Sequence, residues 1–195
     1  MSFRIEEKSV IDKIELVNFR RFMNTYGKIL YPKRTIESLY FDNRSFDSYF
    51  DSEEGVLPRK KIRIRNYPYS NINELFLENK TSSIEGRYKT SVRIDDLKYT
   101  KYKSHLMDDY YGLVFPKSII TYEREYFIIN NFRVTLDTNI RYKSFNGSSI
   151  YNDHNIVIEI KAPVDIDLNF LQNLIQYPRS RFSKYSNSIT FLNLV

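Results

Sequence analysis

The sequence predicts a mainly β fold of the α+β class, with about eight antiparallel strands and a few flanking helices. The clearest observation is the run Arg59–Arg65, in which Ile62 and Ile64 alternate with cationic residues. An alternation with period two is typical of a strand and not of a helix. Similar runs recur along the chain, and short turn sequences separate them, as expected for antiparallel neighbours. Helical spacing is confined to a few segments.

The N-terminal part is expected to hold a strand and then a helix. Phe3–Lys8 alternates weakly, which favours a strand. Asp12 and Glu15 have the spacing of a capping box, and Gly27 can end the helix that they begin. Apolar residues recur in between with helical spacing, at Leu16, Phe19, Met23 and Tyr26.

The remaining elements follow from alternation and from breaking residues. One or two helical turns are expected over Ser45–Phe50, a partly helical segment over Asp95–Phe115, a short helix after Asp167 that stops before Pro178, and a last helix over Ser183–Leu192. A hairpin turn is expected at Asn130 and Asn131. The other predicted strands are Arg34–Phe41, Arg59–Asn66, Glu74–Lys80, Arg87–Ile94, Ser118–Ile129, Phe132–Tyr142 and Asn155–Lys161.

Composition limits the classes of function. The 195 residues carry a formal net charge of +6, which favours an anionic partner, and 42% of them are hydrophobic, which allows a sizeable core. The absence of cysteine excludes disulfides, thiolate metal sites and a cysteine nucleophile. The length suits one large domain or two small ones, and because the sequence has no linker and no repeat of fixed period, we expect a single domain over residues 1–195. No apolar run is long enough to span a membrane and no signal region begins the chain, so we expect the protein in the cytoplasm.

The cationic strand faces allow two interpretations. The first is an ordinary antiparallel sheet with an apolar inner face and a wet outer face. The second is a barrel, which about eight strands can close, with the polar face turned inward as a cationic tunnel. Arginine and lysine inside such a tunnel would hold phosphoryl oxygens. The carboxylates Glu6, Glu78, Asp137 and Glu159 would then hold Mg²⁺ or Mn²⁺, or pair with neighbouring arginines.

Several short motifs together resemble a known family. In order they are Arg4-x-Glu6-x-Lys8, Lys61-x-Arg63-x-Arg65, Glu78-x-Lys80, Lys89, Tyr122-x-Arg124, Arg133, Ile158-Glu159-Ile160-Lys161 and Arg181-Phe182-Ser183-Lys184-Tyr185. The set is similar to the VTC domain, the polyphosphate polymerase branch of the CYTH-like triphosphate tunnel metalloenzymes. The resemblance implies an eight-stranded antiparallel β-barrel whose tunnel binds triphosphate and a divalent metal, Mn²⁺ or Mg²⁺.

The resemblance also implies roles for individual residues. The expected catalytic phosphate-binding residues are Lys8, Arg63, Arg65, Lys80, Lys89, Arg124 and Arg133. Further contacts with polyphosphate are expected from Arg4, Lys61, Lys161, Arg181 and Lys184. Glu159 resembles the metal-binding carboxylate, and Glu6 and Glu78 are further candidate ligands. Arg4 stands where tunnel triphosphatases have their first acidic residue, which favours the polymerase branch.

Three functions remain open at this point. The first is an ATP-dependent polyphosphate polymerase that transfers the γ-phosphate of ATP to a growing chain and releases ADP. The second is a tunnel triphosphatase that hydrolyses nucleoside triphosphate or tripolyphosphate, and the third is a polyanion-binding module without catalysis. We expect ATP and polyphosphate as ligands and no nucleic acid. Because eukaryotic members of the family carry regulatory and transmembrane domains, a regulatory or membrane-associated partner protein is a further question.

Overall fold

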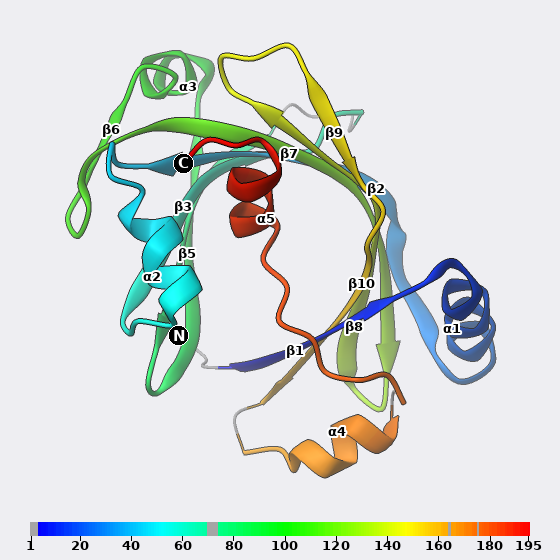
Figure 1. Cartoon of the computed structure of the whole chain (residues 1–195). Coiled ribbons are helices and arrows are strands. Elements are labelled where there is room, and N and C mark those ends of the chain that lie inside the picture. Colours follow the sequence, from blue (N-terminus) through cyan, green and yellow to red (C-terminus); the bar gives the residue numbers. More distant parts are fainter. Residues whose placement is uncertain (1–3, 70–73, 164, 175) are drawn as a thin grey trace.

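The computed structural model describes residues 4–69, 74–163, 165–174 and 176–195 (Figure 1). Within these residues the chain forms ten strands and five helices. The order is β1 (Arg4–Ile11), α1 (Lys13–Tyr26), β2 (Lys28–Asp42), α2 (Asp47–Glu54), β3 (Arg59–Asn66), β4 (Leu75–Ser83), β5 (Gly86–Ile94), α3 (Asp96–Tyr102), β6 (Leu106–Asp108), β7 (Gly112–Ile129), β8 (Phe132–Ser144), β9 (Ile150–Asp153), β10 (Ile156–Pro163), α4 (Leu168–Leu174) and α5 (Lys184–Phe191).

The strands form one rolled antiparallel sheet. Eight of them follow one another around the roll in the order β7, β2, β3, β4, β5, β1, β10 and β8, and β8 pairs again with β7. The short strands β6 and β9 extend β7 and β8 respectively. A single residue pair, Arg4 with Arg87, joins β5 to β1, so backbone pairing leaves the sheet open along most of that seam. The predicted mainly antiparallel β fold with flanking helices is therefore confirmed, but the sheet has ten strands and does not close into the predicted eight-stranded barrel.

Most of the hydrophobic core lies on the outer face of this roll. One cluster packs α1 and α4 against β7, β8 and β10, and it includes Phe19, Met23 and Leu171. A second cluster lies under α3 and β6, against the outer faces of β2, β3 and β4, and includes Ile62 and Ile64. Over these two areas the outer face of the sheet is thus apolar and covered, which leaves the polar face to line the interior.

Helix α5 lies inside the curve of the sheet, as Figure 1 shows. Tyr185 and Ile189 are almost fully buried against inward-facing residues of β2, β7, β8 and β10. The Tyr185 hydroxyl donates to the buried Asp42 carboxylate at 2.6 Å, and the two tyrosine rings of Tyr40 and Tyr185 stack with centroids 5.2 Å apart. The last helix therefore fills part of the interior and carries its first residue, Lys184, into it.

Local sequence signals place several elements as predicted. At the start of α1 the Asp12 carboxylate accepts from the amides of Ile14 and Glu15 at 2.7 and 2.8 Å, and Glu15 accepts from the Asp12 amide at 3.0 Å. Asn130 and Asn131 both have positive φ, 46° and 63°, in the tight turn between β7 and β8. Positive φ at both central residues is typical of the hairpin turn that asparagine favours.

Other predictions of the elements were wrong in extent. Strand β2 begins at Lys28 and not at Arg34, and α2 extends to Glu54. The segment 95–115 is helical in part, as predicted, with seven helical residues in α3; β6 and the first residues of β7, which were not predicted there, follow it. The short strand β9 was not predicted at all. Ile175, expected on the α4 face, lies outside the described residues. None of the described helices is both long and apolar enough to cross a bilayer.

Replacing Phe19 with alanine is expected to destabilise the fold strongly. Phe19 is fully buried, and its ring packs edge-on against that of Phe127 with the two ring centroids 6.0 Å apart. Loss of the Phe19 ring should therefore lower the free energy of unfolding by about 3–5 kcal/mol. Val17→Ala in the same helix is the control, because Val17 is 55% exposed and its loss should change stability by less than about 0.5 kcal/mol. Urea denaturation followed by circular dichroism measures both, and equal effects would contradict this packing.

Candidate functional site

The interior of the rolled sheet holds a cavity of about 400 Å³ with a strongly cationic wall. Among the residues that the structure describes, twelve lysine or arginine side chains and two carboxylates line it, so its wall carries a large excess of positive charge. The acidic residues are Glu6 and Glu159, and the basic residues are Lys8, Arg59, Lys61, Arg63, Arg65, Lys80, Arg87, Arg124, Lys161, Arg179, Arg181 and Lys184.

Strand register brings these cations together. On β3 the residues that alternate with Ile62 and Ile64 point inward, because the isoleucines belong to the outer core. Across the sheet, Lys61 lies directly opposite Lys80, and Lys80 lies opposite Lys89. Like charges directly opposite one another destabilise a sheet. The row therefore needs anionic partners, from the protein or from a ligand.

Glu78 is one such partner inside the protein. Its carboxylate accepts from Arg63 Nε at 2.9 Å and from Lys89 Nζ at 2.7 Å, and it lies 3.7 Å from Arg65 Nη1. Burial alone would raise the pKa of Glu78, but the two arginines and Lys89 hold this pKa well below its usual range. Glu78 is 3% exposed and does not line the cavity. It orients Arg63 and Arg65 from behind the wall.

Asp137, on β8, likewise orients two cationic side chains toward the cavity. Arg124 donates to it in bidentate fashion, from Nε at 2.5 Å and from Nη2 at 2.6 Å, and Lys184 Nζ donates at 2.5 Å. Asp137 is fully buried, and burial raises its pKa while Arg124 and Lys184 lower it, with a net result below the ordinary value. This carboxylate fixes both cations toward the cavity and is saturated by them.

Glu6 and Glu159 are the acidic residues that do face the cavity. Glu6 pairs with Lys80 and lies 3.4 Å from Arg87 Nη1, and Glu159 lies 3.1 Å from Lys161 Nζ. Burial raises the pKa of both carboxyls, and their mutual repulsion also raises that of Glu6. The neighbouring lysines outweigh these effects, so both pKa values lie below the ordinary range.

These two carboxylates fit a hard divalent cation. Mg²⁺ and similar ions bind through one or two carboxylates and complete their shell with substrate phosphates and water. Glu6 and Glu159 supply such a pair in the cavity wall. Among the described residues, no group of three or more acidic or histidine side chains converges on one point. Other ligands of a metal held here would therefore come from the substrate and from water.

Lys8 and Lys61 are lysines with little compensation from the protein. Lys8 Nζ donates to the carbonyl of Phe182 at 2.7 Å, and Lys61 Nζ donates to the hydroxyl of Ser183 at 2.7 Å. Burial lowers the pKa of Lys8 to about 7, although the nearby Glu159 opposes this shift. Burial, reinforced by Lys8 and Lys80, also lowers the pKa of Lys61 far below its ordinary value. An anion in the cavity would raise the pKa of both lysines toward the ordinary value.

The cavity lining also contains Arg59, Arg87, Arg179 and Arg181. Burial and the nearby charges of Arg87 and Arg181 lower the pKa of Arg59, so both arginines repel Arg59. Arg181 is held by the carbonyls of Ser52 and Glu53, in the last turn of α2, and Arg179 pairs with Glu7 at 2.7 Å. The sequence analysis missed Arg59, Arg87 and Arg179 as site residues. Arg59 and Arg87 share alternating faces with Lys61 and Lys89, and this signal could have identified them.

Most of the predicted site residues do line the cavity. They are Glu6, Lys8, Lys61, Arg63, Arg65, Lys80, Arg124, Glu159, Lys161, Arg181 and Lys184. Lys89 and Glu78 do not line the cavity and pair with each other. Arg133 does not line it either, and its guanidinium lies 5.4 Å from the centroid of the Tyr126 ring. The Arg4 side chain lies outside the described part of the structure.

Comparison with known proteins agrees with this geometry. The sequence profile of the VTC domain matches residues 3–193. The chain belongs to the VTC domain family. No curated protein sequence matches this VTC domain, so its relatives are found by structure.

Several solved structures share the fold of the VTC domain at low sequence identity. A Pyrococcus horikoshii protein, PH1819, is 18% identical with a TM-score of 0.63, and the match covers 99% of this chain and 100% of that one. HpAC1 from Hippeastrum, named as a candidate adenylyl cyclase and described as having a dominant triphosphatase activity, is 13% identical with a TM-score of 0.63 and 96% coverage of both chains. A candidate adenylate cyclase from Vibrio parahaemolyticus is 12% identical with a TM-score of 0.63, covering 97% and 98%. The VTC domain thus shares its fold with these proteins.

Replacing Lys8 with methionine is expected to change how stability depends on pH. Above about pH 7 the folded protein releases the Lys8 proton, whereas the unfolded chain keeps it up to its ordinary pKa of 10.5. The unfolded state then binds more protons, so Lys8 makes the stability of the ligand-free protein rise with pH, by at most about 1.4 kcal/mol per pH unit. Lys8→Met should be more stable at pH 7 and show a shallower rise up to pH 9.

Urea denaturation at a series of pH values measures this effect. Lys98→Met is the matched control, because Lys98 is exposed on α3 and its removal should leave the pH dependence unchanged. A Lys8→Met protein with the same slope as the wild type would show that Lys8 is charged throughout this range.

Proposed function

We propose that the VTC domain described here is a metal-dependent polyphosphate polymerase that transfers the γ-phosphate of ATP to a growing polyphosphate chain and releases ADP. The observation that carries the proposal is the cavity wall, with twelve cationic side chains and two carboxylates inside a tunnel fold. A triphosphate or a polyphosphate segment is the kind of ligand that such a wall can neutralise along its length. Membership of the VTC domain family supports the same substrate class.

The residues divide into binding groups and metal ligands. Arg63 and Arg124 are held rigidly by Glu78 and Asp137, so they would present fixed donors to phosphoryl oxygens. Lys8 and Lys61 would supply further charge as the anion arrives. Glu159 and Glu6 would hold the divalent cation. When bound, the metal would neutralise charge on the transferring phosphoryl group.

The electrostatics favour transfer to phosphate over hydrolysis. A terminal phosphate oxygen of polyphosphate is already anionic near neutral pH, so it needs no general base. A water nucleophile would need one, and the candidates in the cavity are Glu6 and Glu159. Neighbouring lysines hold the pKa of both carboxyls below the ordinary range, which makes them weak bases.

A tunnel triphosphatase is the second candidate function. It is favoured by the structural similarity to the Hippeastrum protein described as having a dominant triphosphatase activity. Both activities would use the same cavity and the same metal ligands, so geometry alone treats them alike. Their products differ, because a triphosphatase releases the γ-phosphate to water.

Incubation of the purified protein with ATP and Mn²⁺ is expected to yield polyphosphate. Phosphorus NMR should show signals of internal phosphates of a long chain, which rise as ADP forms. Orthophosphate without chain signals would favour the triphosphatase instead. Unchanged ATP would count against both enzymes, and a triphosphate affinity that is unaffected by metal would then favour a binding module.

Glu159→Gln is expected to lower turnover by at least about 100-fold while ATP still binds. The amide keeps the size of the side chain but removes the charge that would hold the metal. The matched control is Glu123→Gln, since Glu123 pairs with Lys33 and Asn139 and does not line the cavity. Release of ADP at saturating ATP measures both variants. Full activity of Glu159→Gln would rule out this carboxylate as a metal ligand.

A further inference from the structure

A second cluster of inward-facing side chains lies beyond the cavity, at the end opposite α2, Arg59 and Arg181. It comprises Tyr31, Arg34, Tyr67 and Tyr126, and we call it the tyrosine–arginine cluster. In the register of β2 and β7, Arg34 pairs with Arg124 and Tyr31 pairs with Tyr126. Tyr67 comes two residues after Arg65, a step of about 7 Å along an extended chain. The cluster is thus the next layer of the interior after the cavity wall.

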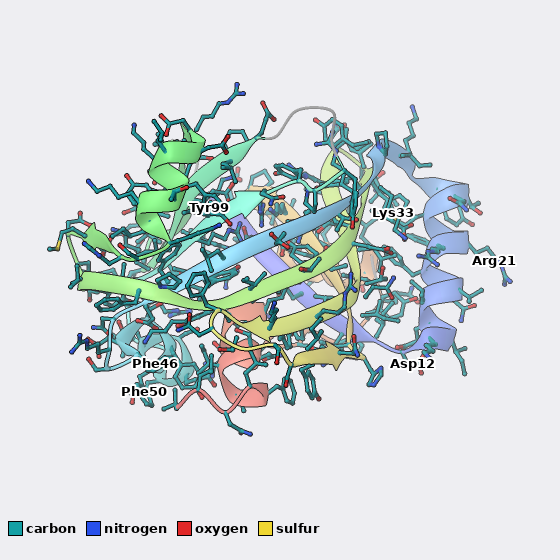
Figure 2. The ribbon with its side chains drawn as sticks, turned by 90° about the horizontal axis from the view of Figure 1, so that it is seen from above. Asp12, Arg21, Lys33, Phe46, Phe50 and Tyr99 are labelled. Carbon is teal, nitrogen blue, oxygen red and sulfur yellow. The ribbon has the colours of Figure 1, made fainter. Side chains whose placement is uncertain are left out.

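The view in Figure 2 separates the two ends. Lys33, the neighbour of Arg34, lies at the end of the sheet that carries α1. Phe46 and Phe50 mark α2 at the other end, where Arg181 is anchored. The interior is therefore arginine-rich toward the α2 end and carries tyrosines around one arginine toward the α1 end.

The cluster offers flat surfaces rather than ion pairs. The Arg34 guanidinium lies 5.5 Å from the ring centroid of Tyr31, 6.0 Å from that of Tyr67 and 5.9 Å from that of Tyr126. Arg34 is exposed and, within the described part of the chain, has no carboxylate partner. Tyr31 is 45% exposed. Tyr67 is partly exposed, whereas Tyr126 is 5% exposed and packs behind them. Partly exposed tyrosine rings such as those of Tyr31 and Tyr67, together with an arginine plane, are the surfaces on which nucleobases stack.

Buried polar atoms without partners lie between the cluster and the cavity. They include Arg65 Nε, Arg133 Nε and Thr135 Oγ1. Arg65 is 7% exposed and Thr135 is fully buried, and Thr135 pairs in register with Tyr126 on one side and Glu159 on the other. Buried donors normally find an acceptor. The hydroxyls of a sugar and the oxygens of its first phosphate would supply acceptors at this depth.

We propose that the tyrosine–arginine cluster binds the nucleobase of a nucleoside triphosphate whose phosphates lie in the cationic cavity. The inference deepens the proposed function and rests on it in one respect, that a triphosphate occupies the cavity. It also fixes a direction. The base lies at the Arg34 end, and the terminal phosphate points toward Arg59 and Arg181.

Comparison of ATP with tripolyphosphate tests this site, because the two share the triphosphate and differ in the nucleoside. Calorimetric titration without divalent metal measures binding in the absence of turnover. Tyr31→Ala and Arg34→Ala should each raise the Kd for ATP about tenfold, which corresponds to about 1.4 kcal/mol. The Kd for tripolyphosphate should stay within about twofold of that of the wild type.

Control variants remove similar side chains elsewhere. Arg21→Ala removes an exposed arginine that projects from α1 away from the sheet, as Figure 2 shows. Tyr110→Ala removes a tyrosine that is 53% exposed and donates to the Pro58 carbonyl. Both controls should leave both affinities unchanged. Should Tyr31→Ala lower the melting temperature, Tyr31→Leu keeps the bulk of the side chain without its aromatic face and should show the same selective loss.

Two results would overturn the proposal. One is an equal loss of affinity for ATP and tripolyphosphate in the cluster variants, which would mean that they disturb the cavity as a whole. The other is no loss for either ligand. Failure of the polymerase reaction would leave the comparison intact, because binding is measured without turnover. Failure of the wild type to bind tripolyphosphate would instead contradict the proposed function of the cavity.

Discussion

The structure depends on how buried positive charge is compensated inside the sheet. A cation in a low-dielectric interior is costly unless it is paired and hydrogen-bonded. Behind the cavity wall, the carboxylates of Glu78 and Asp137 each accept hydrogen bonds from two cationic side chains and so compensate buried positive charge. Glu6 and Glu159 compensate part of what remains. The rest of the wall keeps its excess charge. Burial, with the charges of neighbouring lysines added, lowers the pKa of Lys8 and Lys61.

This constraint also explains where the helices are. When the polar faces of the strands point inward, their apolar faces point outward and must be covered. Helices α1 and α4 cover one part of the outer surface, and α3 covers another. Helix α5 is the exception, because it packs inside and brings Lys184 to Asp137. The same α5 segment places the Ser183 hydroxyl against Lys61, so the end of the chain completes the site.

The sequence predicted the composition of the site better than its contacts. Alternation in β3 identified Lys61, Arg63 and Arg65 as one face of the strand. The family resemblance predicted that this face lines the interior. Alternation alone could not do so, because a wet outer face has the same period. Glu78 was a candidate metal ligand, yet cross-strand register places it directly opposite Arg63, which takes up its charge. Register depends on pairings between strands that no single strand encodes.

The same limit applies to the far end of the interior. Tyr31, Arg34, Tyr67 and Tyr126 come from three separate segments, and irregular pairing of β2 with β7 brings Tyr31 opposite Tyr126. A bulge changes which side chains meet without leaving a pattern that can be read along one strand. The two ends of the interior therefore differ in chemistry although the strands that form them alternate alike. The arginines around Arg59 favour a polyanion at one end of the interior. Tyrosine rings and an arginine plane favour a flat ligand at the other end. This asymmetry gives the interior a direction that the near-uniform charge of the cavity wall does not.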